Sequence, residues 1–174
     1  MTTKIKFDRF VDNKTCRQYI NGTLTVWHCH HYAALYSQLA MDAEETVLLK
    51  ECARISIKDM LLQYIRNYTN TLSQRDKIDT CLQYYSLLGL GKMQLRFMGD
   101  DSGSVELVHS HIDSGWIKKW GKSDKPVNYI TAGFIEAMFE VCMSDDVHSF
   151  YAEETQSIAM GAETSIFKAT RSQQ

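Results

Sequence analysis

Residues 128–142 constrain the fold more than any other part of the chain, because they form a helix-length segment that is apolar on almost every side. A helix of this kind is buried over most of its surface, either in a domain core or in a subunit interface. The rest of the chain must therefore supply layers that cover it. The apolar side chains that surround the segment are those of Ile130, Phe134, Ile135, Met138, Phe139 and Val141.

Three β-hairpins are predicted around this helix. In the first, Asn21-Gly22 provides the two positive-φ residues of a type I′ turn between strands 15–20 and 23–28. The second hairpin has a polar turn rich in Asp, Ser and Gly, and the third turns at Gly161. The strands of these last two hairpins are predicted at residues 94–99, 104–112, 148–160 and 162–170.

Four further helices are expected from apolar spacing and from capping residues. Asp42 and Glu45 have the spacing of a capping box, and Ser73 followed by Asp76 marks another helix start. Helices and antiparallel hairpins alternate without βαβ regularity, so the class is α+β, with hairpins packed against a helical layer. We expect one domain over 1–174, with hairpin and helices in 1–90 and a core motif in 91–170. The helices are predicted at residues 30–40, 42–68, 73–89 and 114–120.

Charge and composition exclude several partners. A net charge of −2 over 174 residues gives no electrostatic reason to expect nucleic acid or an anionic membrane. No apolar run approaches the roughly 20 residues that cross a bilayer. Five scattered cysteines without a CxxC pair indicate reduced thiols and a cytoplasmic location. Gly89-Leu90-Gly91 lacks the third glycine of a dinucleotide fingerprint, so no nucleotide cofactor is expected.

The C-terminal third carries a resemblance to a known family. From Tyr129 the chain reads YITAGFIEAMFEVCMSDDVHSFYAEETQSIAMGAETSIFKATR, a helix around Gly133-Phe134, a strand with Glu154-Thr155, a glycine turn and a closing strand around Phe167. Over residues 90–170 this resembles the 4-vinyl-reductase-type (hydrocarbon-binding) domains, which are related to phenol-sensor domains and to vesicle-tethering complex subunits. The resemblance implies an apolar cavity and a homodimer, but no single reaction.

The chain departs from that family at one site. Many relatives hold zinc through three cysteines and a glutamate, and the corresponding positions here are Thr131, Glu154, Ser157 and Ser165. Serine and threonine hydroxyls do not replace thiolates as zinc ligands. We therefore expect no structural zinc at this place.

Histidines gather in two short segments, His28-Cys29-His30-His31 and His109-Ser110-His111. Residues i and i+2 of a strand point to the same side, so each His-x-His pair can face inward. Facing pairs would suit iron, copper or zinc. The same residues fit a polar patch that contacts a ligand without metal, or a purely structural role. The candidate metal ligands are His28, His30, His31, His109 and His111.

Aromatic residues flank both histidine segments and suggest a pocket. Trp116 and Trp120 share one helix face and would cover a cavity lined by Tyr32, Tyr36 and Phe134. Core packing is the alternative interpretation. The sequence therefore predicts a small-molecule-binding domain that encloses an apolar or aromatic ligand. A His-ligated iron or zinc enzyme of oxygenase or reductase type is the alternative, so whether the chain is an enzyme stays open. The candidate ligand-binding residues are Trp27, Tyr32, Tyr36, Trp116, Trp120 and Phe134.

Overall fold

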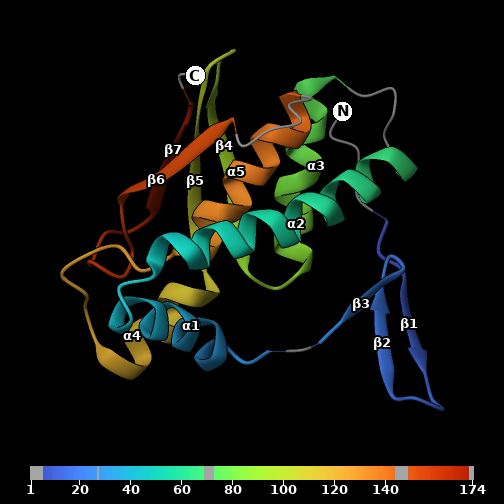
Figure 1. Ribbon diagram of the computed structural model, residues 1–174, viewed down its shortest axis with the longest axis horizontal. Coiled ribbons are helices and arrows are strands. Elements are labelled where there is room, and N and C mark those ends of the chain that lie inside the picture. Colours follow the sequence, from blue (N-terminus) through green and yellow to red (C-terminus); the bar gives the residue numbers. More distant parts are fainter. Residues whose placement is uncertain (1–5, 27, 69–72, 144–148, 173–174) are drawn as a thin grey trace.

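The computed structural model of the chain describes residues 6–26, 28–68, 73–143 and 149–172. Within these ranges it contains helices and antiparallel sheets (Figure 1), so the predicted α+β class is confirmed. The elements are β1 (Arg9–Asp12), β2 (Arg17–Ile20), β3 (Thr23–Thr25), α1 (His30–Asp42), α2 (Thr46–Tyr68), α3 (Gln74–Leu87), β4 (Gly91–Met98), β5 (Ser102–Ser110), α4 (His111–Trp120), α5 (Tyr129–Met143), β6 (Phe150–Gln156) and β7 (Ser165–Arg171).

The strands form two separate sheets. The larger has the order β4-β5-β7-β6, so β4 and β6 are its edges, and the smaller has the order β1-β2-β3. Figure 1 shows the smaller sheet standing apart from the larger one, beyond α1 and α2. Helix α5 packs against α2, α3 and the strands β6 and β7, and therefore lies at the centre of the larger body.

The first hairpin differs from its prediction at both ends. Its turn is confirmed, because Asn21 and Gly22 both have positive φ and connect β2 to β3. However, β3 ends at Thr25 rather than continuing to His28, and an unpredicted strand, β1, pairs with the outer side of β2. The chain leaves the sheet after Thr25 because helix α1 begins only a few residues later.

The expected helix start at Asp42 is wrong. Helix α1 continues to Asp42, whose carboxylate accepts a hydrogen bond from the Gln38 side chain at 2.5 Å instead of capping a new helix. Glu44 adopts the left-handed conformation (φ 58°), which ends α1, and α2 begins at Thr46. The other predicted cap is confirmed, since the Ser73 hydroxyl accepts a hydrogen bond from the Asp76 N–H.

Helix α5 is buried within its own chain. Residues 131–142 are all buried, and Phe134 and Met138 have no exposed surface. The suggestion that this helix forms a homodimer interface is therefore wrong, because α2, α3 and the sheet already cover it. In the described ranges, no helix is both long and apolar enough to cross a bilayer.

A glycine sets the spacing of α2 and α5. A Cβ atom at Gly133 would lie 2.3 Å from the backbone carbonyl oxygen of Lys50, so the two helices cross almost in backbone contact. Any larger residue would force the helices apart. This close crossing brings the side chains that follow on each helix within ion-pair distance of one another.

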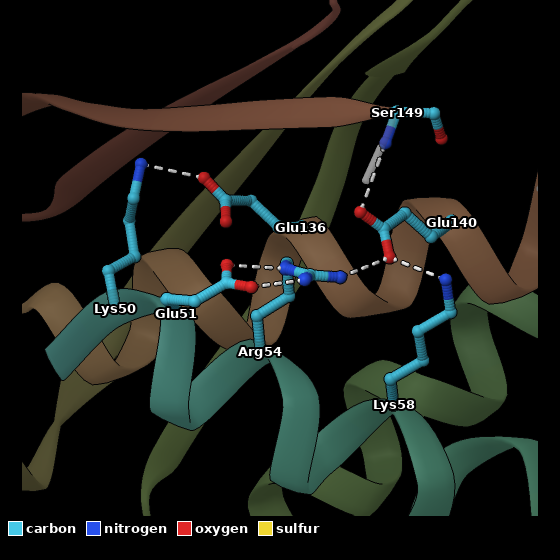
Figure 2. Close-up of polar contacts among 7 residues, drawn as sticks. All are labelled: Lys50, Glu51, Arg54, Lys58, Glu136, Glu140 and Ser149. Carbon is cyan, nitrogen blue, oxygen red and sulfur yellow. Dashed lines mark hydrogen bonds and ion pairs between the residues drawn. The ribbon is translucent and has the colours of Figure 1, made fainter. Parts of the chain in front are cut away.

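Two glutamates of α5 enter this helix crossing and meet cations from α2 (Figure 2). Glu136 is 2.7 Å from the Lys50 ammonium, and Glu140 is 3.0 Å from the Arg54 guanidinium and 2.8 Å from Lys58. Both carboxylates are fully buried. A buried charge is tolerated only when it is paired and hydrogen-bonded, so these contacts are required for α5 to occupy the core.

The same glutamates also bind the backbone beside β6. The Ala152 N–H donates to Glu136 at 2.9 Å, and the Ser149 N–H donates to Glu140 at 3.3 Å. The Lys50 ammonium donates to the Ala152 carbonyl oxygen at 3.5 Å. At Ala152, the Lys50–Glu136 pair therefore takes the place that a neighbouring strand would fill.

This arrangement predicts that Glu136→Gln strongly destabilises the fold. Glutamine still accepts the Ala152 N–H, but it leaves the Lys50 ammonium buried without its counter-ion. Removing one member of a buried ion pair costs about 3–5 kcal/mol, so we expect a loss of about that size in urea unfolding. Glu163→Gln, at an exposed loop position, is the control. Equal stability of the two variants would contradict the role given to the Lys50–Glu136 ion pair. Adding Lys50→Met to Glu136→Gln should restore part of the lost stability, because it removes the unpaired buried ammonium.

Candidate functional site

Three of the five candidate histidines come together where α1 and α4 begin. The ring centroid of His30 lies 4.1 Å from that of His31 and 5.5 Å from that of His111. His109 is exposed on β5. Its predicted common face with His111 is wrong because β5 ends at Ser110. The Ser110 hydroxyl accepts the Asp113 N–H and starts α4, so His111 is helical.

The remaining histidine, His28, contacts two tyrosines of α1. Its ring centroid is 6.0 Å from that of Tyr32 and 6.2 Å from that of Tyr36, and both tyrosines are exposed. Among the residues that the structure describes, no three His, Cys, Asp or Glu side chains are grouped as a metal site requires. Burial and the neighbouring His30 lower the pKa of His111, so its imidazole is neutral at pH 7.

A pocket adjoins these histidines, and we call it the N-terminal pocket. It lies between the small sheet, the start of α1 and the turn from α3 to β4, and its volume is about 360 Å³. Its lining is mostly apolar, with the imidazoles of His28 and His111 among a few polar groups. The lining residues are Phe7, Ile20, Thr25, Val26, His28, Ala33, Leu87, Leu88, Gly89, Leu90 and His111.

None of the candidate ligand-binding residues that the structure describes is in the lining of this pocket; these residues are Tyr32, Tyr36, Trp116, Trp120 and Phe134. Trp116 is buried against Ala34, with its ring centroid 4.8 Å from that of the half-exposed Trp120, and its indole Nε1 has no hydrogen-bond partner among the described residues. Phe134 belongs to a different packed cluster and contacts Tyr85. The structure therefore does not bring them together as the lid and wall of one cavity. Trp27 lies outside the described residues.

A buried polar cluster connects α4, the start of α5 and β6. Its residues were not identified as a group from the sequence. Asp113 has no exposed surface, and its carboxylate accepts hydrogen bonds from the Asn128 side chain at 2.8 Å and the Ala159 N–H at 3.2 Å. The Asn128 N–H donates to Glu154 at 3.4 Å. The cluster connects segments far apart in the sequence, so linear spacing could not identify it. Its only local signal was the Ser110-x-x-Asp113 cap.

Burial dominates the electrostatics of this cluster. It raises the pKa of Asp113, and burial together with the nearby Asp113 charge raises the pKa of Glu154 to about 7. The Ser157 and Ser165 hydroxyls near Glu154 partly oppose this rise. Glu154 Oε1 has no hydrogen-bond partner of normal geometry among the described residues. Two neighbouring buried carboxyls thus lie in one cluster, and that of Glu154 is partly protonated at neutral pH.

The four positions at which many relatives hold zinc are all buried here, and among the described residues Glu154 Oε1 and Ser157 Oγ have no hydrogen-bond partner of normal geometry. The Thr131 hydroxyl is 2.7 Å from the Tyr85 hydroxyl, and the Ser165 hydroxyl accepts the Ile158 N–H at 2.9 Å. Glu154 and Ser157 are also buried. These positions therefore belong to the packed interior between α5 and the β6–β7 hairpin.

Comparison with solved structures identifies the class of fold. No family model and no curated protein matches the sequence. Several solved structures match the fold. The phenol-responsive sensory domain of the transcription activator PoxR, solved with phenol, aligns with a TM-score of 0.79 at 9% identity, covering 94% of this chain and 84% of that one.

Two further structures have the same class of fold. Subunit 3 of a trafficking protein particle complex from Naegleria fowleri, covalently bound to palmitic acid, aligns with a TM-score of 0.55 at 10% identity, covering 83% of this chain and 95% of that one. A vinyl-4-reductase family protein from Methanocaldococcus jannaschii aligns with a TM-score of 0.56 at 12% identity, covering 86% and 85%. The structural similarity to 4-vinyl-reductase-type domains expected from the sequence is confirmed.

The raised pKa of Glu154 predicts a specific pH dependence of stability. Between the ordinary value near 4.5 and about 7, the folded state binds more protons at this site than the unfolded state, so stability falls as pH rises through that window. Glu154→Gln removes this contribution, which is about 3 kcal/mol in total. We expect the variant to gain stability relative to wild type between pH 5 and pH 8 in urea unfolding.

The exposed Glu163→Gln variant is the matched control for that comparison. It should follow the wild-type profile at every pH, because its carboxylate is solvated. A Glu154→Gln profile parallel to that of wild type would show that Glu154 titrates normally.

Proposed function

We propose that this chain binds a small apolar or aromatic molecule in the N-terminal pocket. The observation that carries the proposal is the lining itself, in which aliphatic and aromatic side chains surround two imidazoles. Apolar walls with a few polar groups are the usual form of a small-molecule site. Burying the apolar surface of a ligand supplies the affinity, and the polar groups fix its orientation.

The comparisons support the same class of ligand. The PoxR domain was solved with phenol, and the trafficking-complex subunit carries palmitic acid. Both molecules are small and largely apolar, although one is an aromatic alcohol and the other an acyl chain. With identities of 9% and 10%, these structures share the fold with this chain, and the ligand class is our inference.

The histidines provide the polar contact in this proposal. Neutral His111 can donate or accept a hydrogen bond, which suits a hydroxyl or carboxyl group at one end of an apolar molecule. Beside it, His30 Nε2 is buried without a hydrogen-bond partner among the described residues. An unpaired buried polar atom is costly, so a ligand or water that pairs with it would stabilise the site.

We propose no second function. The metal-dependent enzyme stays a prediction from the histidine spacing, but His109 is on a different element from His111 and faces solvent. The three histidines that do gather line the end of an apolar pocket or lie next to it. This placement fits a polar contact for an apolar ligand.

The proposal predicts that phenol or palmitate raises the melting temperature of the wild-type protein. A ligand at about 100 times its Kd stabilises the folded state by about 2.7 kcal/mol. Ala33→Leu, which fills part of the pocket, should abolish the shift for at least the larger ligand. Ala43→Leu, at an exposed position after α1, is the matched control and should keep it. No shift for either compound, or an equal shift in both variants, would contradict the proposal.

We further propose that the chain forms the homodimer expected from its family resemblance, through the small sheet. Register places Phe10, Tyr19 and Leu24 side by side on one face, where Phe10 and Leu24 are more than half exposed. Phe10→Lys should give monomers in sedimentation velocity, whereas Val11→Lys, on the opposite face of the same strand, should not. A monomeric wild type or a dimeric Phe10→Lys variant would contradict this interface.

A further inference from the structure

A second pocket, which we call the α2–β6 pocket, lies on a different part of the molecule. It is formed by the first turns of α2, the start of α5 and strand β6, and its volume is about 220 Å³. No residue lines both this pocket and the N-terminal pocket. Its walls include Val47, Pro126, Tyr129 and Tyr151, and its acidic groups are Glu153 and Glu154.

The charge of the α2–β6 pocket is negative. Among the described residues, no ion pair joins Glu153 or Glu154 to a cation, whereas the one cation in the lining, Lys50, is paired with Glu136. Glu154 is only 8% exposed, and its Oε1 atom has no hydrogen-bond partner of normal geometry in the part of the chain described. Burial keeps part of this carboxyl in its neutral form at pH 7, and a cation bound beside it would stabilise the ionised form through a charged hydrogen bond.

The protein itself places an ammonium group against one wall of this pocket. Lys50 Nζ lies 3.6 Å from the ring centroid of Tyr151 and 2.7 Å from Glu136. An aromatic face together with a carboxylate is the usual environment for an alkylammonium group. Tyr129 and Glu154 offer the same two chemical groups in the same lining, and among the described residues Glu154 has no cation.

The lining distinguishes an organic cation from a metal ion. A hard metal ion needs several oxygen ligands around one point, and the described residues contain no group of three metal-binding side chains. The walls are partly apolar, which suits the carbon chain of an organic cation. We propose that the α2–β6 pocket binds a small alkylammonium ligand, with Glu154 as its counter-ion and Tyr129 and Val47 in contact with its carbon chain. This inference does not depend on the proposed function.

The experiment compares n-butylammonium with 1-butanol, which has a similar shape but no charge. Each is titrated at pH 8, where Glu154 is mostly ionised, and at constant ionic strength, while backbone amide NMR shifts are followed. In wild type, n-butylammonium should bind roughly tenfold more tightly than 1-butanol, since a charged hydrogen bond is worth at least that factor. The largest shifts should be those of Val47, Tyr129 and Glu153.

Two glutamate variants test the counter-ion. Glu154→Gln should remove the preference for n-butylammonium, and the exposed Glu163→Gln should retain it. A preference that persists in Glu154→Gln, equal wild-type affinity for the two compounds, or shifts confined to residues outside this pocket would each overturn the proposal. The shift map of wild type decides the matter even where a variant folds poorly, because it needs no substitution.

Discussion

Two carboxylates lie inside the core because α5 is buried on every side, and the fold must neutralise both. Glu136 and Glu140 meet cations of α2 where Gly133 allows the two helices to cross closely. Buried ion pairs add little net stability compared with apolar packing, but an unpaired member is very costly. The pairs therefore fix how α2 lies on α5, and that placement in turn shapes the α2–β6 pocket.

The two pockets differ in chemistry because different elements supply their walls. The N-terminal pocket takes its apolar groups from the α3–β4 turn and the small sheet, and its polar groups include the imidazoles of His28 and His111. The α2–β6 pocket takes its carboxylates from β6, next to the ion pairs of the core. The chain therefore has a mostly apolar pocket and an acidic pocket on separate surfaces.

Two local sequence signals were interpreted correctly, whereas the capping-box spacing of Asp42 and Glu45 was not. The Asn21-Gly22 turn and the Ser73 cap each depend on a few adjacent residues, and both were predicted correctly. The apolar helix was also found, but apolarity on all sides does not say which neighbours cover it, so Phe134 was assigned to a pocket wall although it packs in the core. Tertiary contacts decide that question, and one sequence does not contain them in readable form.

The prediction for the histidines was wrong, and the buried carboxyls were not detected from the sequence, for related reasons. The pairing of His109 with His111 assumed that β5 continues, whereas the Ser110 cap starts α4 and turns the second side chain away. Asp113 of α4, Asn128 just before α5 and Glu154 of β6 are brought together by the fold, a convergence that residue spacing does not encode. The positions of single helices and strands were therefore more predictable than the tertiary contacts between them.

The contacts that Lys50 and Glu136 make with Ala152 have a consequence for self-assembly. An open sheet edge is a template on which further chains can add as strands, which leads to aggregation. Here the backbone groups of Ala152 on edge strand β6 are already bonded to side chains, and the opposite edge, β4, is made irregular by two register shifts. Each edge of the larger sheet thus carries a local feature that hinders the addition of a further strand.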